Sequence, residues 1–198
     1  MAEPIDFYFD FSSPYAYFAS TQIEALAADV GREVNWHPIL LGPLFKAMGS
    51  APLTEIPLKG DYALRDFART AELFQIPYVQ PQPFPIGTVS AARAVLFLRE
   101  QRHPKAISFA KALFRAYFAE QKNISDAKVV IALAAELGID PDALAAGMAM
   151  ESTKQLLKTE VDTAMARGVF GSPFMLIDGE PFWGFDRFEH IRKRLVQA

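Results

Sequence analysis

The stretch Phe7-Tyr8-Phe9-Asp10-Phe11-Ser12-Ser13-Pro14-Tyr15 joins an apolar strand pattern directly to the start of a helix. Apolar residues then recur at a spacing of three or four, which is typical of an amphipathic helix. Ser-Pro is a favoured pair for the N-cap and the first helical residue. We therefore predict a strand over residues 5–11 and a helix over 14–30 that ends at Gly31, a residue suited to a left-handed conformation. Because a helix N-terminus stabilises an anion placed against it, we expect the chemistry at this junction.

The composition indicates a folded globular protein. The chain has 198 residues, of which 51% are hydrophobic, enough for a sizeable core. Twenty basic against 23 acidic residues, with no basic cluster, argue against a nucleic-acid partner. The sequence shows no secretory leader and no run of about 18 apolar residues, so we expect a soluble, cytoplasmic protein with no membrane contact.

The chain contains no cysteine. This excludes disulfides, cysteine-based metal sites and dithiol redox chemistry by protein groups. It does not exclude thiol chemistry by a bound cofactor, so an anion at the helix start would be supplied from outside.

The order of the predicted elements indicates a split α/β unit. A second strand is expected over 34–41, and near the other end strands over 174–177 and 181–183 flank the hairpin signal Asp178-Gly179. Asp186, followed by Glu189 in a capping-box pattern, is expected to start a last helix. Strand, helix and strand followed much later by a hairpin and a helix is the order of a thioredoxin-like α/β fold with an all-helical insertion. We assign residues 1–43 and 169–198 to the thioredoxin-like domain and 44–168 to the helical domain.

Proline, glycine and polar residues punctuate this helical middle part. We expect one helix to start at Thr88 or Ser90, one after Pro104, one at Ser125 that ends at Gly138, one at Asp140-Pro141, and a last one that ends at Gly168. The stretch over 76–87 is rich in proline and is expected to be a semi-rigid loop with apolar side chains that line a pocket.

Pro173 has a special position in this architecture, immediately before the first strand of the hairpin. A thioredoxin-like fold usually carries a cis-proline there, facing the N-terminus of the first helix. A cis bond would turn the backbone N–H and C=O of Ser172 toward an extended, peptide-like ligand. A plain turn that opens a strand is the alternative.

Five motifs together resemble those of 2-hydroxychromene-2-carboxylate isomerases and kappa-class glutathione transferases. The resemblance spans nearly the whole chain, and the motifs stand in the family's order and spacing. The family shares the thioredoxin-like fold with a helical insertion, binds glutathione and is usually dimeric. The motifs are residues 9–17, 59–62, 87–93, 169–173 and 183–187.

The resemblance implies that Ser13 lies beside the glutathione sulfur and donates a hydrogen bond to the thiolate. The physical chemistry agrees, because a helix N-terminus and nearby donors lower a thiol pKa from about 8.5 to about 3.5–7.5. Ser13 would then activate the thiol without being the nucleophile. Its alternative role is a plain N-cap, and the two roles are compatible because a hydroxyl both accepts and donates. The neighbouring Ser12 remains open as a further candidate.

Other residues are assigned to the cofactor by the same resemblance. The Ser172 backbone would pair with the cysteinyl part of glutathione, while Phe185 and Asp186 would meet the γ-glutamyl end. Lys59 would face the carboxylate side, although it could also be a solvated surface lysine, and Asp186 could simply cap a helix. Ser50 stands where relatives often carry asparagine, so one polar contact is in doubt.

The expected substrate is a small, flat aromatic compound. Phe84 and Trp183 are candidates for the walls of its pocket, with burial in the core as the alternative. His37, His103 and His190 are too scattered to indicate a metal site or a catalytic triad, and no metal is expected.

The combined prediction is a homodimeric, glutathione-dependent isomerase of aromatic catabolism. It would interconvert 2-hydroxychromene-2-carboxylate and trans-o-hydroxybenzylidenepyruvate by reversible addition of a thiolate. One alternative is a kappa-class-like glutathione transferase that conjugates electrophiles. The other is a non-catalytic module that binds a peptide or a small acid.

Overall fold

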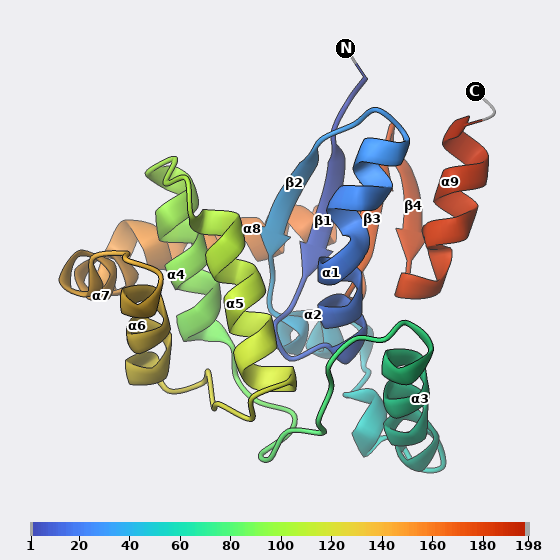
Figure 1. The fold of residues 1–198 in the computed structure, drawn as a ribbon, viewed down its shortest axis with the longest axis horizontal. Coiled ribbons are helices and arrows are strands. Elements are labelled where there is room, and N and C mark those ends of the chain that lie inside the picture. Colours follow the sequence, from blue (N-terminus) through green and yellow to red (C-terminus); the bar gives the residue numbers. More distant parts are fainter. Residues whose placement is uncertain (1, 197–198) are drawn as a thin grey trace.

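One four-stranded sheet brings the two ends of the chain together (Figure 1). The computed structural model describes residues 2–196. β1 runs parallel to β2 and antiparallel to β3, and β3 forms an antiparallel hairpin with β4, so the order is β2-β1-β3-β4. These are the strand directions that the predicted thioredoxin-like fold requires. The strands are β1 (Ile5–Phe9), β2 (Val34–Pro38), β3 (Phe174–Ile177) and β4 (Glu180–Trp183).

Helices occupy most of the chain between β2 and β3. Within residues 2–196 the α-helices are α1 (Pro14–Asp29), α2 (Leu41–Met48), α3 (Lys59–Leu73), α4 (Val89–Glu100), α5 (Ala106–Phe118), α6 (Ala127–Glu136), α7 (Pro141–Ala149), α8 (Glu151–Ala166) and α9 (Phe188–Val196). Two 3-10 turns, η1 (Leu53–Glu55) and η2 (Phe185–Arg187), precede α3 and α9. None of the helices in this described part is long and apolar enough to cross a bilayer.

The helices cover the sheet unevenly. α1 crosses one face, α8 passes behind the sheet, and α4 to α7 form a group on the side of β2 (Figure 1). α3 stands apart from this group and packs chiefly against η1 (Figure 1). The end of the sheet that faces α2 and α3 is therefore less covered than the rest.

Alternating side chains of β1 separate two buried clusters. Phe7 and Phe9 belong to the larger cluster, which α1 and α5 cover, whereas Tyr8 belongs to the smaller cluster with Leu157 and Val161 of α8. This is the period of two that a strand imposes on its side chains. Burial on both faces explains why the sequence of this strand is almost continuously aromatic.

The predicted hairpin and the first helix are confirmed. Asp178 and Gly179 both have positive φ, at 51° and 82°, as a two-residue type I′ turn demands. α1 begins at Pro14 with Ser13 as N-cap, and Gly31, at φ 68°, follows its C-cap. The Ser172-Pro173 bond is cis, which decides between the two alternatives for this position, and Gln82-Pro83 and Phe84-Pro85 are cis as well.

Several predicted boundaries are wrong. β2 ends at Pro38 instead of residue 41, because the chain turns there and α2 begins at Leu41, whose N–H donates to the Asp10 carboxylate (2.7 Å). β1 ends at Phe9 instead of residue 11, since the Asp10 N–H donates to the Ser172 hydroxyl (2.8 Å) and leaves the strand pairing.

Two predicted helix starts are also wrong. The cap of α6 is Asp126, whose carboxylate accepts from the Lys128 N–H (2.8 Å), while the Ser125 hydroxyl donates to the Asn123 side chain. α9 begins at Phe188 after the turn η2, so Asp186 lies before this helix instead of opening it.

Candidate active site

One large cavity opens where α1, the segment from α2 to α3 and the end of the hairpin meet. Its volume is about 1120 Å³. Every side chain that the sequence singled out for catalysis, cofactor or substrate lines it: Ser13, Ser50, Lys59, Phe84, Ser172, Trp183, Phe185 and Asp186. Residues from distant parts of the sequence are thus gathered in one place, while their individual roles stay predictions.

Ser13 links the start of α1 to the segment before β3. Its hydroxyl oxygen accepts from the Ala16 N–H (3.2 Å), and the hydroxyl donates to the Ser172 carbonyl (2.8 Å). The side chain therefore caps the helix and reaches Ser172 at the same time. Ser13 is only 6% exposed, so a ligand reaches this hydroxyl from within the cavity.

A buried carboxylate, Asp10, fixes the turn between β1 and α1. It accepts from the Ser12 N–H (2.8 Å), the Thr88 hydroxyl (2.7 Å) and the Leu41 N–H (2.7 Å). Burial raises the pKa of Asp10, against the opposing effect of these three hydrogen bonds. The carboxylate ties together the starts of α1, α2 and α4. Thr88, one of the two predicted starts, is the N-cap residue of α4. Its hydroxyl makes no capping hydrogen bond and donates to Asp10 instead.

The proline-rich loop between α3 and α4 forms a second wall. The Ile86 N–H donates to the Ser12 hydroxyl oxygen (3.2 Å), which ties this loop to the start of α1. Phe84 is half-buried and packs edge-on against Phe67 of α3. The Tyr117 hydroxyl donates to the Pro83 carbonyl (2.9 Å) and holds the loop from the side of α5.

α3 supplies the third wall. Lys59 is its first residue and is exposed, and Phe67 lines the cavity further along. The Tyr15 hydroxyl donates to the Asp66 carboxylate, which also accepts from Arg69 (2.8 Å). Burial, together with Asp66, raises the pKa of Tyr15, so this hydroxyl keeps its proton. The bond fastens α3 to α1 directly beside Ser13.

The end of the hairpin completes the site. Trp183 is 54% exposed at the cavity edge. The Asp186 carboxylate pairs with Arg187 (2.9 Å) and folds back over Gly184, whose φ is 109°. Phe185 is buried against Phe74, so its side chain belongs to the core as well as to the wall.

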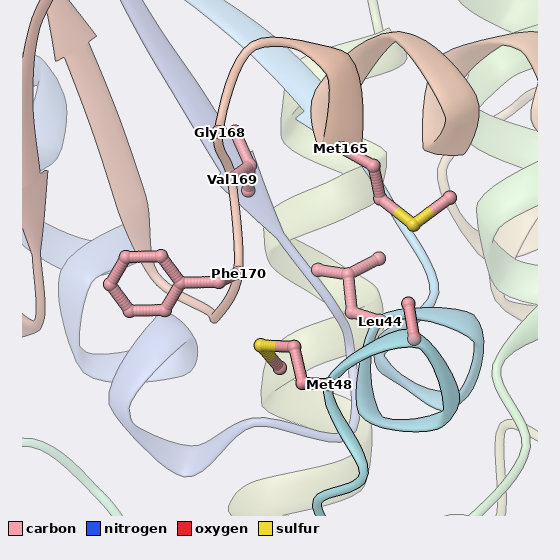
Figure 2. Close-up of a pocket in the computed structure, with 7 residues that line it drawn as sticks. Leu44, Met48, Met165, Gly168, Val169 and Phe170 are labelled. Atoms are coloured by element: carbon pink, nitrogen blue, oxygen red, sulfur yellow. The ribbon is translucent and has the colours of Figure 1, made fainter.

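A smaller pocket of about 210 Å³ adjoins the cavity between α2 and the segment after α8 (Figure 2). Met48 and Phe170 line both spaces and separate them. The rest of its lining is apolar: Leu44, Ala47, Met165, Gly168 and Val169. Nothing in the sequence pattern singled out this pocket.

Sequence reasoning also missed Tyr15, Asp66 and Arg187 as site residues. Tyr15 follows the Ser-Pro pair, and Arg187 lies inside one of the motifs, so proximity to the quoted motifs was the available signal. Asp66 gave no such signal. Within residues 2–196, no three His, Asp or Glu side chains lie close enough together to hold a metal ion.

Comparison with known proteins gives relatives over the full length of the fold. The family of DSBA-like thioredoxin domains matches residues 4–196. A 2-hydroxychromene-2-carboxylate isomerase of Pseudomonas putida is 30% identical over 92% of this chain and 89% of its own length. Glutathione S-transferase kappa 1 of Caenorhabditis elegans is 25% identical over 98% of this chain and 91% of its own.

A solved structure supports the same relationship. The structure of a 2-hydroxychromene-2-carboxylate isomerase superposes with a TM-score of 0.85 at 26% identity, covering 98% of this chain and 94% of that one. Together with the family match, this likeness confirms the predicted thioredoxin-like fold.

Proposed function

The chain belongs to the DSBA-like thioredoxin domain family, in the group of 2-hydroxychromene-2-carboxylate isomerases and kappa-class glutathione transferases, and from this premise we propose that it is a glutathione-dependent isomerase. The isomerase relatives support an isomerase. We propose 2-hydroxychromene-2-carboxylate and trans-o-hydroxybenzylidenepyruvate as its reactants. A cytoplasmic homodimer remains our expectation for the assembled protein.

The shape and lining of the large cavity fit glutathione. Ligand pockets usually measure about 300–1,000 Å³, and the volume here, about 1120 Å³, leaves room for a tripeptide and a bicyclic acid side by side. The lining contains two cations, Lys59 and Arg187, that could pair with the carboxylates of glutathione. It also contains the carboxylate of Asp186, which could pair with the ammonium group of glutathione. Ser172 lines the cavity, and its carbonyl accepts from the Ser13 hydroxyl.

Bound glutathione would supply a thiolate, which adds reversibly to a conjugated double bond and allows rotation about the former double bond. The protein's part is to hold the thiol as its anion. The observation that carries the proposal is the position of the Ser13 hydroxyl, at the start of α1 and 2.8 Å from the Ser172 carbonyl. The Ser13 hydroxyl would exchange its hydrogen bond to the Ser172 carbonyl for one to the thiolate, because a charged acceptor forms the stronger hydrogen bond. The Ser172 carbonyl would then accept an amide N–H of the tripeptide.

The remaining contacts follow the same pattern. Lys59 would attract a carboxylate of the tripeptide, and Asp186 would accept its ammonium group while it stays paired with Arg187. Ser50 would offer a hydroxyl where relatives offer an amide. Phe84 and Trp183 would hold the flat face of the substrate by apolar contact.

The decisive experiment follows both the substrate and the thiol. We expect conversion of 2-hydroxychromene-2-carboxylate only with glutathione present, and a constant concentration of total thiol during turnover. Ser13→Ala should lower kcat about a hundredfold, the scale of losing one donor to a developing anion. Ser125→Ala, which changes an exposed serine that does not line the cavity, is the matched control.

Other results would favour another function. Unchanged turnover and glutathione dependence in Ser13→Ala would refute the role of this serine. Loss of one thiol for each substrate molecule converted would indicate a conjugating transferase. This is the second candidate function, because the chain is 25% identical to a kappa-class transferase. If calorimetry detects binding of a small acid but no binding of glutathione, the protein would be a non-catalytic binding module.

A further inference from the structure

We propose that Ser12 is a second catalytic hydroxyl, which donates a hydrogen bond to an oxygen of the substrate. The inference rests on the proposed function, since it places an aromatic acid in the same cavity as the tripeptide. It concerns the substrate side of the site and assigns Ser12 a task different from that of Ser13.

The two neighbouring hydroxyls differ in how their hydrogens are used. The Ser13 hydroxyl accepts from the Ala16 N–H and donates to the Ser172 carbonyl. The Ser12 hydroxyl accepts from the Ile86 N–H (3.2 Å) and, among the hydrogen bonds of residues 2–196, donates to no protein group. A hydroxyl carries a single hydrogen. The hydrogen of Ser12 is therefore available to a ligand without the loss of a protein contact, whereas that of Ser13 first has to leave the Ser172 carbonyl.

The two serines also face different walls of the cavity. The Ser13 side chain touches Ser172, where the tripeptide is proposed to bind. The Ser12 side chain touches Ile86, in the loop that carries Phe84, the proposed wall of the substrate pocket. These consecutive residues thus contact different walls of the cavity, and the Ser12 side chain lies beside the wall proposed for the substrate.

Ser12 is held in place for this task. Its N–H donates to the buried Asp10 carboxylate (2.8 Å), which fixes the backbone, and the Ile86 N–H fixes the side-chain oxygen. A hydroxyl that accepts a hydrogen bond becomes a stronger donor through its own hydrogen. Ser12 is also half-buried, so it is more accessible than Ser13.

Because the Ser12 hydroxyl is a hydrogen-bond donor, the ligand has to carry an acceptor atom that faces it. Ser12 would recognise an aromatic compound that carries a carboxylate or carbonyl oxygen next to its conjugated double bond. A site built around such a hydrogen bond discriminates against an analogue that lacks the oxygen, because the polar group is then left unpaired.

Binding experiments with unreactive compounds test the inference directly. Calorimetry would compare trans-2-hydroxycinnamate with 2-propenylphenol, which keeps the ring and the double bond but lacks the carboxylate. We expect Ser12→Ala to weaken the acid about tenfold, as the loss of a hydrogen bond to a charged group implies. The affinity of Ser12→Ala for 2-propenylphenol should equal that of the parent protein. Ser12→Thr, which keeps a hydroxyl, should bind the acid as tightly as the parent protein does.

The same variants are titrated with glutathione, and the ionisation of its bound thiol is followed by ultraviolet absorbance. We expect Ser12→Ala to leave both properties unchanged, in contrast to Ser13→Ala. Equal affinity of Ser12→Ala and the parent protein for the acid overturns the inference, as does a parent that does not bind the acid. A Ser12→Ala variant that raises the thiol pKa overturns it too. Absence of glutathione binding by the parent refutes the proposed function alone, because the acid titration still reports on Ser12.

Discussion

The indole of Trp183 lies directly against the backbone of Gly171, so that a Cβ at residue 171 would stand 2.3 Å from its Nε1 atom. This contact leaves room only for glycine. Phe170 also packs edge-on against the indole, with 5.0 Å between ring centroids. The segment that carries Ser172 is therefore positioned by an aromatic side chain from the facing strand.

Gly171→Ala should displace Trp183 or the segment before Ser172. We expect a loss of about 1–3 kcal/mol in the free energy of unfolding, typical of overpacking, together with weaker glutathione binding. Urea denaturation and calorimetry measure the two effects. Gly87→Ala is the control, because a Cβ there meets nothing within 4 Å. If Trp183→Ala combined with Gly171→Ala regained no stability, the steric explanation would be wrong.

Lys59 should contribute charge to the binding of glutathione. Because its side chain is exposed at the start of α3, we expect Lys59→Gln to weaken binding only about fivefold, and less at high salt. Lys128→Gln on α6, which removes an exposed lysine that does not line the cavity, is the matched control. Equal affinities of the two variants at low salt would show that Lys59 is only a surface residue.

Glu160 should make the stability of the protein depend on pH in the acid range. Burial alone would raise its pKa, but hydrogen bonds from His37 and Arg99 outweigh burial and lower the pKa from 4.5 to about 2. The Arg99 contact is 2.7 Å long. Since the folded-state pKa lies below the ordinary value, the stabilisation is complete above pH 4.5 and is lost as the pH falls toward 2.

Glu160→Gln should therefore lower the free energy of unfolding by about 2–3 kcal/mol at neutral pH. The difference from the parent protein should shrink between pH 4.5 and 2, as followed by urea denaturation at a series of pH values. Glu151→Gln, which changes an exposed carboxylate on the same helix, should have little effect. A difference that does not vary with pH would contradict this account.

The bond between Tyr15 and Asp66 should hold α3 in place. Tyr15→Phe removes the hydroxyl and keeps the ring, so we expect amides of residues 59–73 to exchange hydrogen faster while those of α5 do not change. Tyr17→Phe is the matched control, since its hydroxyl donates to the Pro77 carbonyl (2.8 Å) in the neighbouring loop. The same protection of α3 in both variants would show that its other contacts suffice.

Local signals made much of the fold predictable. Ser13-Pro14 predicted the start of α1, and Gly31 predicted its end. Asp178-Gly179 predicted the hairpin, because capping and turn geometry depend on the residues at those positions. The order of these elements then indicated the sheet. Pro173 was the candidate for a cis bond because of its place in that order, and the structure confirms the bond.

Contacts between residues far apart in the sequence determine the features that the local sequence did not predict. β2 ends early because Leu41 donates to Asp10, a residue 31 positions away. Asp66 enters the site because it accepts from the hydroxyl of Tyr15, 51 positions away. Capping of α6 by Asp126 instead of Ser125 was a choice between two adjacent residues that are both good caps.

The hydrogen bond between Ser13 and Ser172 joins positions 159 residues apart. A ribosome therefore releases the first half of the site long before the second half exists. Until β3 emerges and pairs with β1, the aromatic side chains of β1 lack one neighbour in the sheet. These side chains are consequently prone to aggregation throughout synthesis of the helical middle part, and chaperone dependence should fall once residues 174–183 have left the ribosome and β3 has paired with β1.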